Sequence, residues 1–125
     1  MKARDLMVDD WVYNKIIDKP IRVYPTMFSQ MFRQNPNLTT EDFGIYPISL
    51  TSEILEKNGF EHEKNVGYVY DDNYGTIVVY DTFNQRLKII RDLNIIFDSQ
   101  DFADVKVNEL QHALHLCKVD KEITM

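Results

Sequence analysis

Three polar side chains near the end of the chain have the residue types of a metal site: Glu109, His112 and His115. Side chains three residues apart on a helix lie close together and histidine is a common metal ligand, so His112 and His115 could share one zinc ion. Six residues of helix place Glu109 about 9 Å along the axis from His115, too far for the same ion. The zinc-protease pattern H-E-x-x-H is absent from the sequence. We therefore predict no metal and no cofactor, and keep a small metal-dependent enzyme using His112 and His115 as the alternative.

The remaining polar groups form no catalytic pattern that the sequence alone can identify. Asp98, Asp101 and Asp104 are spaced by three residues without a glycine, whereas calcium loops alternate their ligands around a sharp glycine turn. We expect Asp104 instead to cap the terminal helix. Cys117, the single cysteine, falls on an apolar face, which predicts a buried thiol and not a nucleophile. The scattered glycines, at positions 44, 59, 67 and 75, make no phosphate-binding loop. Carboxylate pairs that meet in space stay open, because the chain has 20 acidic residues.

The charge of the chain is acidic and uneven, which bears on its partners. The net charge is -6, and the middle third, residues 41–80, carries most of the acidic excess. Nucleic-acid binding needs a basic face, because contacts with phosphates supply most of the affinity. Only residues 2–33 could offer a weak one, with Lys2, Arg4, Lys15, Lys19, Arg22 and Arg33. We therefore do not expect a nucleic-acid partner.

Length and composition bound the class of protein. A chain of 125 residues with 44% hydrophobic residues predicts a single domain over residues 1–125 with its own core. One cysteine cannot form an intrachain disulfide, and no apolar run approaches the roughly 20 residues that a membrane-spanning helix needs. The first ten residues are charged and carry no apolar core of a secretion signal. We expect a cytoplasmic protein that does not enter a membrane.

Two helices are predicted to hold these side chains in place. In the last segment, Val107, Leu110, Leu114 and Cys117 recur at the spacing of one helical stripe, so we expect residues 107–125 to form a helix that docks this face on a core. The two histidines then lie on the polar side. A second, short helix is predicted over 51–58, with Thr51 as N-cap, Gly59 as the left-handed residue that ends it, and Phe60 folded back on Leu55.

The rest of the chain reads as antiparallel sheet. Turn residues punctuate β-branched and aromatic runs over residues 66–97, which predicts a meander. Its second strand, 76–81, is apolar on both faces, so we expect it to be central. Residues 5–14 and 21–27 predict an N-terminal hairpin, and residues 27–44 a loop with a short helix. The fold class is α+β: an antiparallel sheet that could curl into a small barrel, one short mid-chain helix, and a C-terminal amphipathic helix packed on the sheet.

Three segments together resemble a family of small uncharacterised proteins from gut-anaerobe genomes and their prophage-like elements. The segments are DLMVDDWVYN, PISLTSEILEKNGF and VNELQHALHLCKVDKEITM. They are similar to the family's D-L-x-x-G-D-W-V, P-I-x-L-T-x-E-x-L-x-K-x-G-F and V-H-x-L-Q. This chain departs from that pattern at Asp9, where relatives often carry glycine, and at Asn108, where they often carry histidine. The resemblance implies an accessory or host-interaction protein of a phage or mobile element, and it implies no activity.

We predict a non-enzymatic interaction protein whose protein partner is unidentified and whose oligomeric state the sequence does not set. The contact surface is expected on the sheet, at Tyr68, Tyr70, Tyr74 and Tyr80, because tyrosine combines an apolar ring with a polar tip. The alternative is that these four rings belong to the core and its rim.

Overall fold

The computed structural model describes residues 1, 5–34, 39–99 and 105–125. These residues form two compact units. The N-terminal unit comprises Met1–Ile48 and Lys106–Asn108, and the C-terminal unit comprises Ser49–Val105 and Glu109–Met125. The division into two units does not test whether residues 1–125 form a single domain, which stays a prediction. No helix of the described ranges has the length and apolar character that a membrane span requires.

The N-terminal unit is a small antiparallel sheet with a helix. Its strands are β1 (Trp11–Asn14), β2 (Lys19–Arg22) and β3 (Ile45–Tyr46), in the order β2-β1-β3. The helices are α1 (Pro25–Gln34) and the 3-10 helix η2 (Thr40–Phe43). A cluster of buried apolar side chains forms the core: Leu6, Val12, Val23, Met27, Met31 and Ile45.

Two sequence-based boundaries in this unit were wrong. The first strand begins at Trp11 and not at residue 5, because Asp9 takes a left-handed conformation with φ 73° in the turn before it. Met27 lies in α1 and not in the second strand. Pro25 fits the first turn of a helix, where its missing N–H would have no partner in any case, and it therefore begins α1.

The short mid-chain helix has the capping that the sequence predicts. Helix α2 spans Ser52–Lys57, and the Thr51 side chain accepts a hydrogen bond from the Ile54 N–H. Gly59 has φ +85°, and the Phe60 N–H returns to the Leu55 carbonyl at 3.0 Å. Leu55 and Phe60 are both buried, so the turn that ends α2 also seals part of the core.

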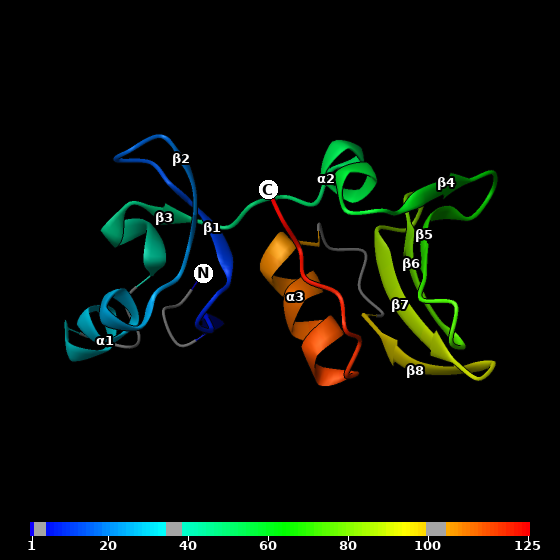
Figure 1. Cartoon of the computed structure of the whole chain (residues 1–125). Coiled ribbons are helices and arrows are strands. Elements are labelled where there is room, and N and C mark those ends of the chain that lie inside the picture. The colour runs from blue at the N-terminus through cyan, green and yellow to red at the C-terminus, as the bar shows by residue number, and fades with distance from the viewer. Residues whose placement is uncertain (2–4, 35–38, 100–104) are drawn as a thin grey trace. The chain divides into compact units, whose positions relative to one another are not determined.

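The C-terminal unit is built on a five-stranded antiparallel meander (Figure 1), in the order β4-β5-β6-β7-β8. The strands are β4 (Glu61–Glu63), β5 (Gly67–Asp71), β6 (Thr76–Asp81), β7 (Arg86–Arg91) and β8 (Asn94–Asp98). Strand β6 is central, as its two apolar faces predict. The fold class is confirmed as α+β with antiparallel sheet, but both sheets are open, so the suggested barrel does not form.

Helix α3 (Val107–Leu116) carries the predicted apolar stripe, and Val107, Leu110, Leu114 and Cys117 are all buried. The prediction that the helix continues to Met125 was wrong, because Lys118 takes a left-handed conformation with φ 54° and residues 119–125 are not helical. The predicted cap at Asp104 lies outside the described residues. Two polar contacts tie the end of the chain to the C-terminal unit. Arg91 of β7 donates from Nη2 to the Cys117 carbonyl at 2.6 Å. Asn58, at the end of α2, exchanges hydrogen bonds with the Thr124 backbone at 2.7 and 2.9 Å.

Gly67 opens β5 at a point of very close backbone approach. A Cβ atom at this position would lie 2.1 Å from the Tyr80 carbonyl oxygen of β6, and the residue has φ +124°. Gly59 also has positive φ, but its nearest neighbour would be Lys121 Nζ at 3.9 Å. Alanine at position 59 would therefore meet only the strain of a positive φ, whereas alanine at position 67 would also clash with the backbone of β6.

We predict that Gly67→Ala lowers the free energy of unfolding by about 3 kcal/mol or more, because backbone atoms of β6 must move. Gly59→Ala, the control, should cost about 1–2 kcal/mol from left-handed strain alone. Urea titrations followed by circular dichroism measure both. Equal losses for the two variants would show that β5 and β6 do not approach as closely as described.

Candidate functional site

The five-stranded sheet presents two faces that differ in what covers them. Strand pairing sets Tyr68 opposite Tyr80, Val78 opposite Ile89, and Tyr80 opposite Leu87, so these side chains share one face. All five are buried. We call this the inner face, because α2, α3 and the C-terminal tail make their contacts there.

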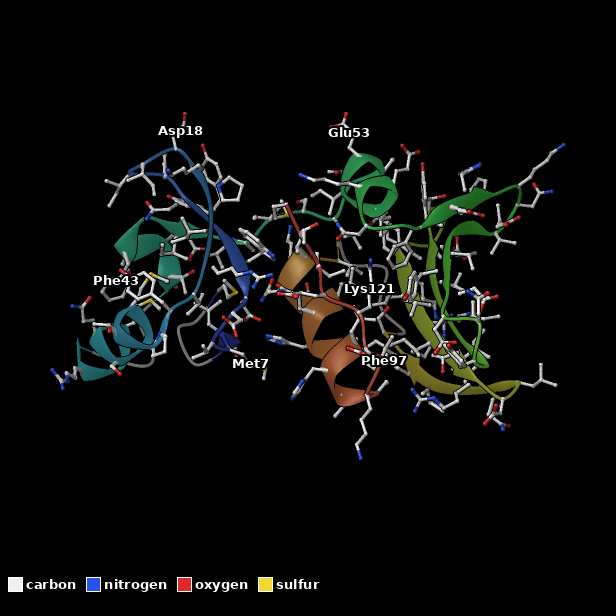
Figure 2. The ribbon with its side chains drawn as sticks, viewed as in Figure 1. Met7, Asp18, Phe43, Glu53, Phe97 and Lys121 are labelled. Carbon is white, nitrogen blue, oxygen red and sulfur yellow. The ribbon has the colours of Figure 1, made fainter. Side chains whose placement is uncertain are left out.

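Those contacts reach the inner face from three segments. The Tyr68 hydroxyl lies 3.3 Å from Glu56 Oε1 of α2, and Lys121 Nζ of the tail lies 5.4 Å from the centre of the Tyr70 ring. Figure 2 shows Lys121 and Phe97 on the side of the sheet toward α3. Arg91 holds the end of α3 on the same side. One face of the sheet is thus closed by the chain itself.

The outer face is apolar over part of its area. The pairing places Ile77, Ile90 and Ile95 in one row across β6, β7 and β8, with Asp71 of β5 at its end. The neighbouring row brings Val69 beside Val79. Ile95 is 58% exposed, and the other four apolar side chains are half-buried among their neighbours. Within the described ranges no hydrogen bond or ring contact from a helix reaches these residues.

Two turns at the same end of the sheet extend this apolar area. The Asp92 N–H donates to the Gly75 carbonyl at 3.0 Å, which joins the β5–β6 turn to the β7–β8 turn. Tyr74 and Leu93 stand beside this bond, and they are 91% and 97% exposed. We use the name apolar end for Val69, Tyr74, Ile77, Val79, Ile90, Leu93 and Ile95.

Leu93 is unusual in its backbone as well as in its exposure. Asp92 and Leu93 have φ 51° and 70°, so both central residues of this two-residue hairpin are left-handed. Asn-Gly and Asp-Gly are the sequences that such turns favour, and a left-handed leucine costs roughly 1–2 kcal/mol. A strained backbone that holds a fully exposed leucine is a reason to look for a binding role.

The edges of the sheet are less suited to binding than its face. Strand β4 has only three residues and carries Glu61 and Glu63, and a short charged edge resists pairing with another strand. Strand β8 has a register shift against Ile89 and Ile90, which places an extra residue, Ile96, in the edge strand. Such a bulge twists an edge away from regular pairing.

Carboxylates border the apolar end. Asp71, Asp72 and Asp92 lie in or beside the two turns. Asp72 Oδ1 accepts hydrogen bonds from the N–H groups of Tyr74 and Thr76, at 2.7 and 3.0 Å. These bonds favour the charged form and hold the pKa of Asp72 below its ordinary value of 3.8. This end of the sheet is therefore negative at neutral pH.

The opposite end of the outer face carries paired charges. Arg86 donates to both Asp98 oxygens at 2.6 Å, and this bidentate pair raises the pKa of the Arg86 guanidinium. Burial would raise the pKa of Asp81, but hydrogen bonds from Asn84 and Phe83 outweigh it and the pKa is lowered. Lys88 lies opposite Asp98, and its charge also acts on Asp81. The cations Arg86 and Lys88 therefore balance the carboxylates of Asp81 and Asp98.

The four tyrosines of the predicted surface do not share one environment. Tyr68 and Tyr80 are buried opposite each other on the inner face, and Tyr70 is half-buried there, 5.6 Å from the ring of Phe60. Tyr74 stands apart in its turn and is exposed. The binding surface at these residues stays a prediction. The outer-face row of isoleucines was missed, although the two apolar faces of β6 were its signal.

The predicted metal candidates lie on α3. His112 is half-buried, whereas His115 and Glu109 are exposed. His112 and Glu109 each interact with another group. Within the described ranges no three or more His, Cys, Asp or Glu side chains gather as ion ligands would. Asp101 and Asp104 lie outside these ranges. The zinc alternative at His112 and His115 stays a prediction.

Cys117 is buried at the end of α3, as expected. Burial raises the pKa of the Cys117 thiol, and the nearby charge of Arg91 opposes this only in part. The thiol is therefore protonated at neutral pH, which is the state of a packing residue and not of a nucleophile.

The N-terminal unit contains a cavity of about 430 Å³. This volume lies in the range of small-molecule sites, roughly 300–1,000 Å³. Its lining combines apolar side chains with one guanidinium and two amides: Asn14, Met27, Gln30, Met31, Arg33, Phe43 and Ile45. Asn14 Oδ1 already accepts a hydrogen bond from the Ile16 N–H at 2.9 Å.

Comparisons of the chain with protein families, with curated proteins and with solved structures found no match.

We predict that acid destabilises the protein partly through Asp72. A carboxyl with a lowered folded pKa stabilises the fold above its unfolded pKa, near 3.8, and this contribution is lost as the pH falls through the folded pKa. Asp72→Asn keeps an acceptor oxygen but no charge, so its urea midpoint should change less between about pH 5 and pH 2. Asp72→Ala, which removes the acceptor as well, should be less stable at every pH. Parallel curves for wild type and Asp72→Asn would contradict the assignment.

Proposed function

We propose that this chain is a protein-binding module that uses the apolar end of its C-terminal unit. The supporting observation is the outer-face row Ile77–Ile90–Ile95, which lies next to the two turns that carry the exposed Tyr74 and Leu93. A contiguous exposed apolar area with a polar border is the ordinary mark of a protein-interaction site. Binding, and not catalysis, is the role that such a surface supports.

The backbone strain at Leu93 supports a binding role for its exposed side chain. A turn with left-handed φ at positions 92 and 93 would be more stable with glycine at the second position. The leucine adds no buried contact in exchange, because it is 97% exposed. A side chain that lowers the stability of the isolated chain is accounted for if a partner covers it.

The biological setting of the proposal comes from the sequence. The resemblance to proteins of prophage-like elements supports an accessory or host-interaction protein of a phage or mobile element. The single buried cysteine suits a reducing compartment, so we propose that this binding takes place in the cytoplasm. Contact with a host protein would then be made through the apolar end.

We predict that Leu93→Gly makes the protein more stable while it removes partner binding. The free energy of unfolding should rise by about 0.5–1 kcal/mol. Glycine relieves the left-handed strain, and the larger conformational entropy of glycine in the unfolded chain cancels part of this gain. Thermal unfolding measures the first effect. Capture from an extract of the natural host, with wild type and variant as paired baits and quantitative mass spectrometry, measures the second.

Phe83→Ser supplies the matched control. Phe83 is also an exposed large apolar side chain, at 82%, and it lies in the β6–β7 turn at the other end of the sheet. A partner bound through the apolar end should be kept by Phe83→Ser and lost by Leu93→Gly. Equal recovery of every captured protein by wild type and Leu93→Gly would refute the proposed function.

A further inference from the structure

We infer that the partner presents an amphipathic helix with a basic border, which packs its apolar stripe on the isoleucine row of the outer face, beside the two acidic turns. This inference rests on the proposed function and identifies the chemistry of the partner. It follows from the apolar row of the outer face, from the length of that row across the strands, and from the charge beside it.

A helix is the element that fits this face. A sheet face with apolar rows packs in proteins either on helices or on another sheet, and pairing along the edges is hindered at both β4 and β8. The row from Asp71 to Ile95 crosses four strands, which is about 14 Å at the usual strand spacing. Roughly ten residues of helix cover that length.

The charge of the border selects a basic partner. Asp71, Asp72 and Asp92 lie at the apolar end, and no Lys or Arg shares its isoleucine row across β5 to β8. Arg91, the nearest guanidinium in the sequence, is engaged on the inner face with Thr76 and Cys117. Lys88 lies opposite Val79, in the row next to the isoleucines, with Asp98 of β8 as its other neighbour. Arg86 lies farther along, where it is paired with Asp98. Lysine or arginine flanking an apolar stripe would meet Asp71, which ends the isoleucine row, and Asp72 and Asp92 in the two turns. The charge of Arg91 acts on Asp72 and offsets only part of this negative charge.

The same charges disfavour a second copy of this chain as the occupant. Two identical faces packed with their turns at the same end would bring two acidic borders together, and the net charge of -6 adds a general repulsion in any orientation. A helix with a basic border meets neither repulsion.

The test uses two synthetic helical peptides of about 16 residues that share one leucine stripe and differ only in their flanking residues. One carries lysine and the other glutamate. Fluorescence anisotropy with the full chain should show binding of the lysine peptide that weakens as the salt concentration rises, and much weaker binding of the glutamate peptide. Amide shifts in the NMR spectrum should change at Ile77, Ile90 and Leu93.

The charge requirement is tested by a triple variant with Asp71→Asn, Asp72→Asn and Asp92→Asn. Asparagine retains the acceptor oxygens that the turns use, so the fold is kept while the charge is lost. Affinity for the lysine peptide should fall about tenfold. Asp81→Asn is the matched control, because Asp81 accepts the same kind of turn bonds at the opposite end, and it should leave the affinity unchanged.

Three outcomes would overturn the inference. The first is binding of neither peptide, the second is equal binding of both, and the third is self-association of the chain that Leu93→Gly abolishes, since this identifies a second copy as the occupant. The proposed function is judged separately by the paired capture. A captured partner that needs Leu93 but has no basic helix would leave the binding module in place and remove this inference alone.

Discussion

Arg91 makes the contact on which the arrangement of the C-terminal unit depends. Its guanidinium reaches from β7 to the Thr76 hydroxyl of β6 and to the Cys117 carbonyl at the end of α3. A cation at a helix C-terminus is favoured by the helix dipole, and hydrogen bonds from charged donors are the stronger kind. These bonds hold the end of α3 on the inner face, which also carries the buried side chains of Val78, Leu87 and Ile89. The outer face, with similar apolar residues, is left for another occupant.

The sequence predicts those elements whose signals are local. The cap at Thr51 and the left-handed Gly59 define α2 within nine residues, and the stripe from Val107 to Cys117 defines α3. The central place of β6 also follows from its own residues, since a strand that is apolar on both faces must be flanked and covered. In each case the periodicity of a few neighbouring side chains is enough.

The choice between the two faces could not be predicted, because it depends on contacts between distant residues. Asn58 binds the backbone of Thr124, 66 residues away, and no local pattern marks either residue. The register that aligns Ile77, Ile90 and Ile95 depends on two turns, and one of these is an Asp-Leu pair without the usual glycine. Tyrosines that look equivalent in the sequence are for the same reason divided between a buried pair and an exposed tip. Strand β4 was missed because Glu61–Glu63 has no apolar alternation at all.

An exposed apolar face must be protected from unintended association, and the features around it explain how this face is tolerated. Charge on β4 and the bulge in β8 hinder strand pairing at both edges. The three carboxylates at the apolar end repel a second copy and any other acidic surface. They do not repel a basic one. The features that would hinder self-association of the chain are thus the features that would select the proposed partner, so both would arise from one distribution of charge around one apolar row.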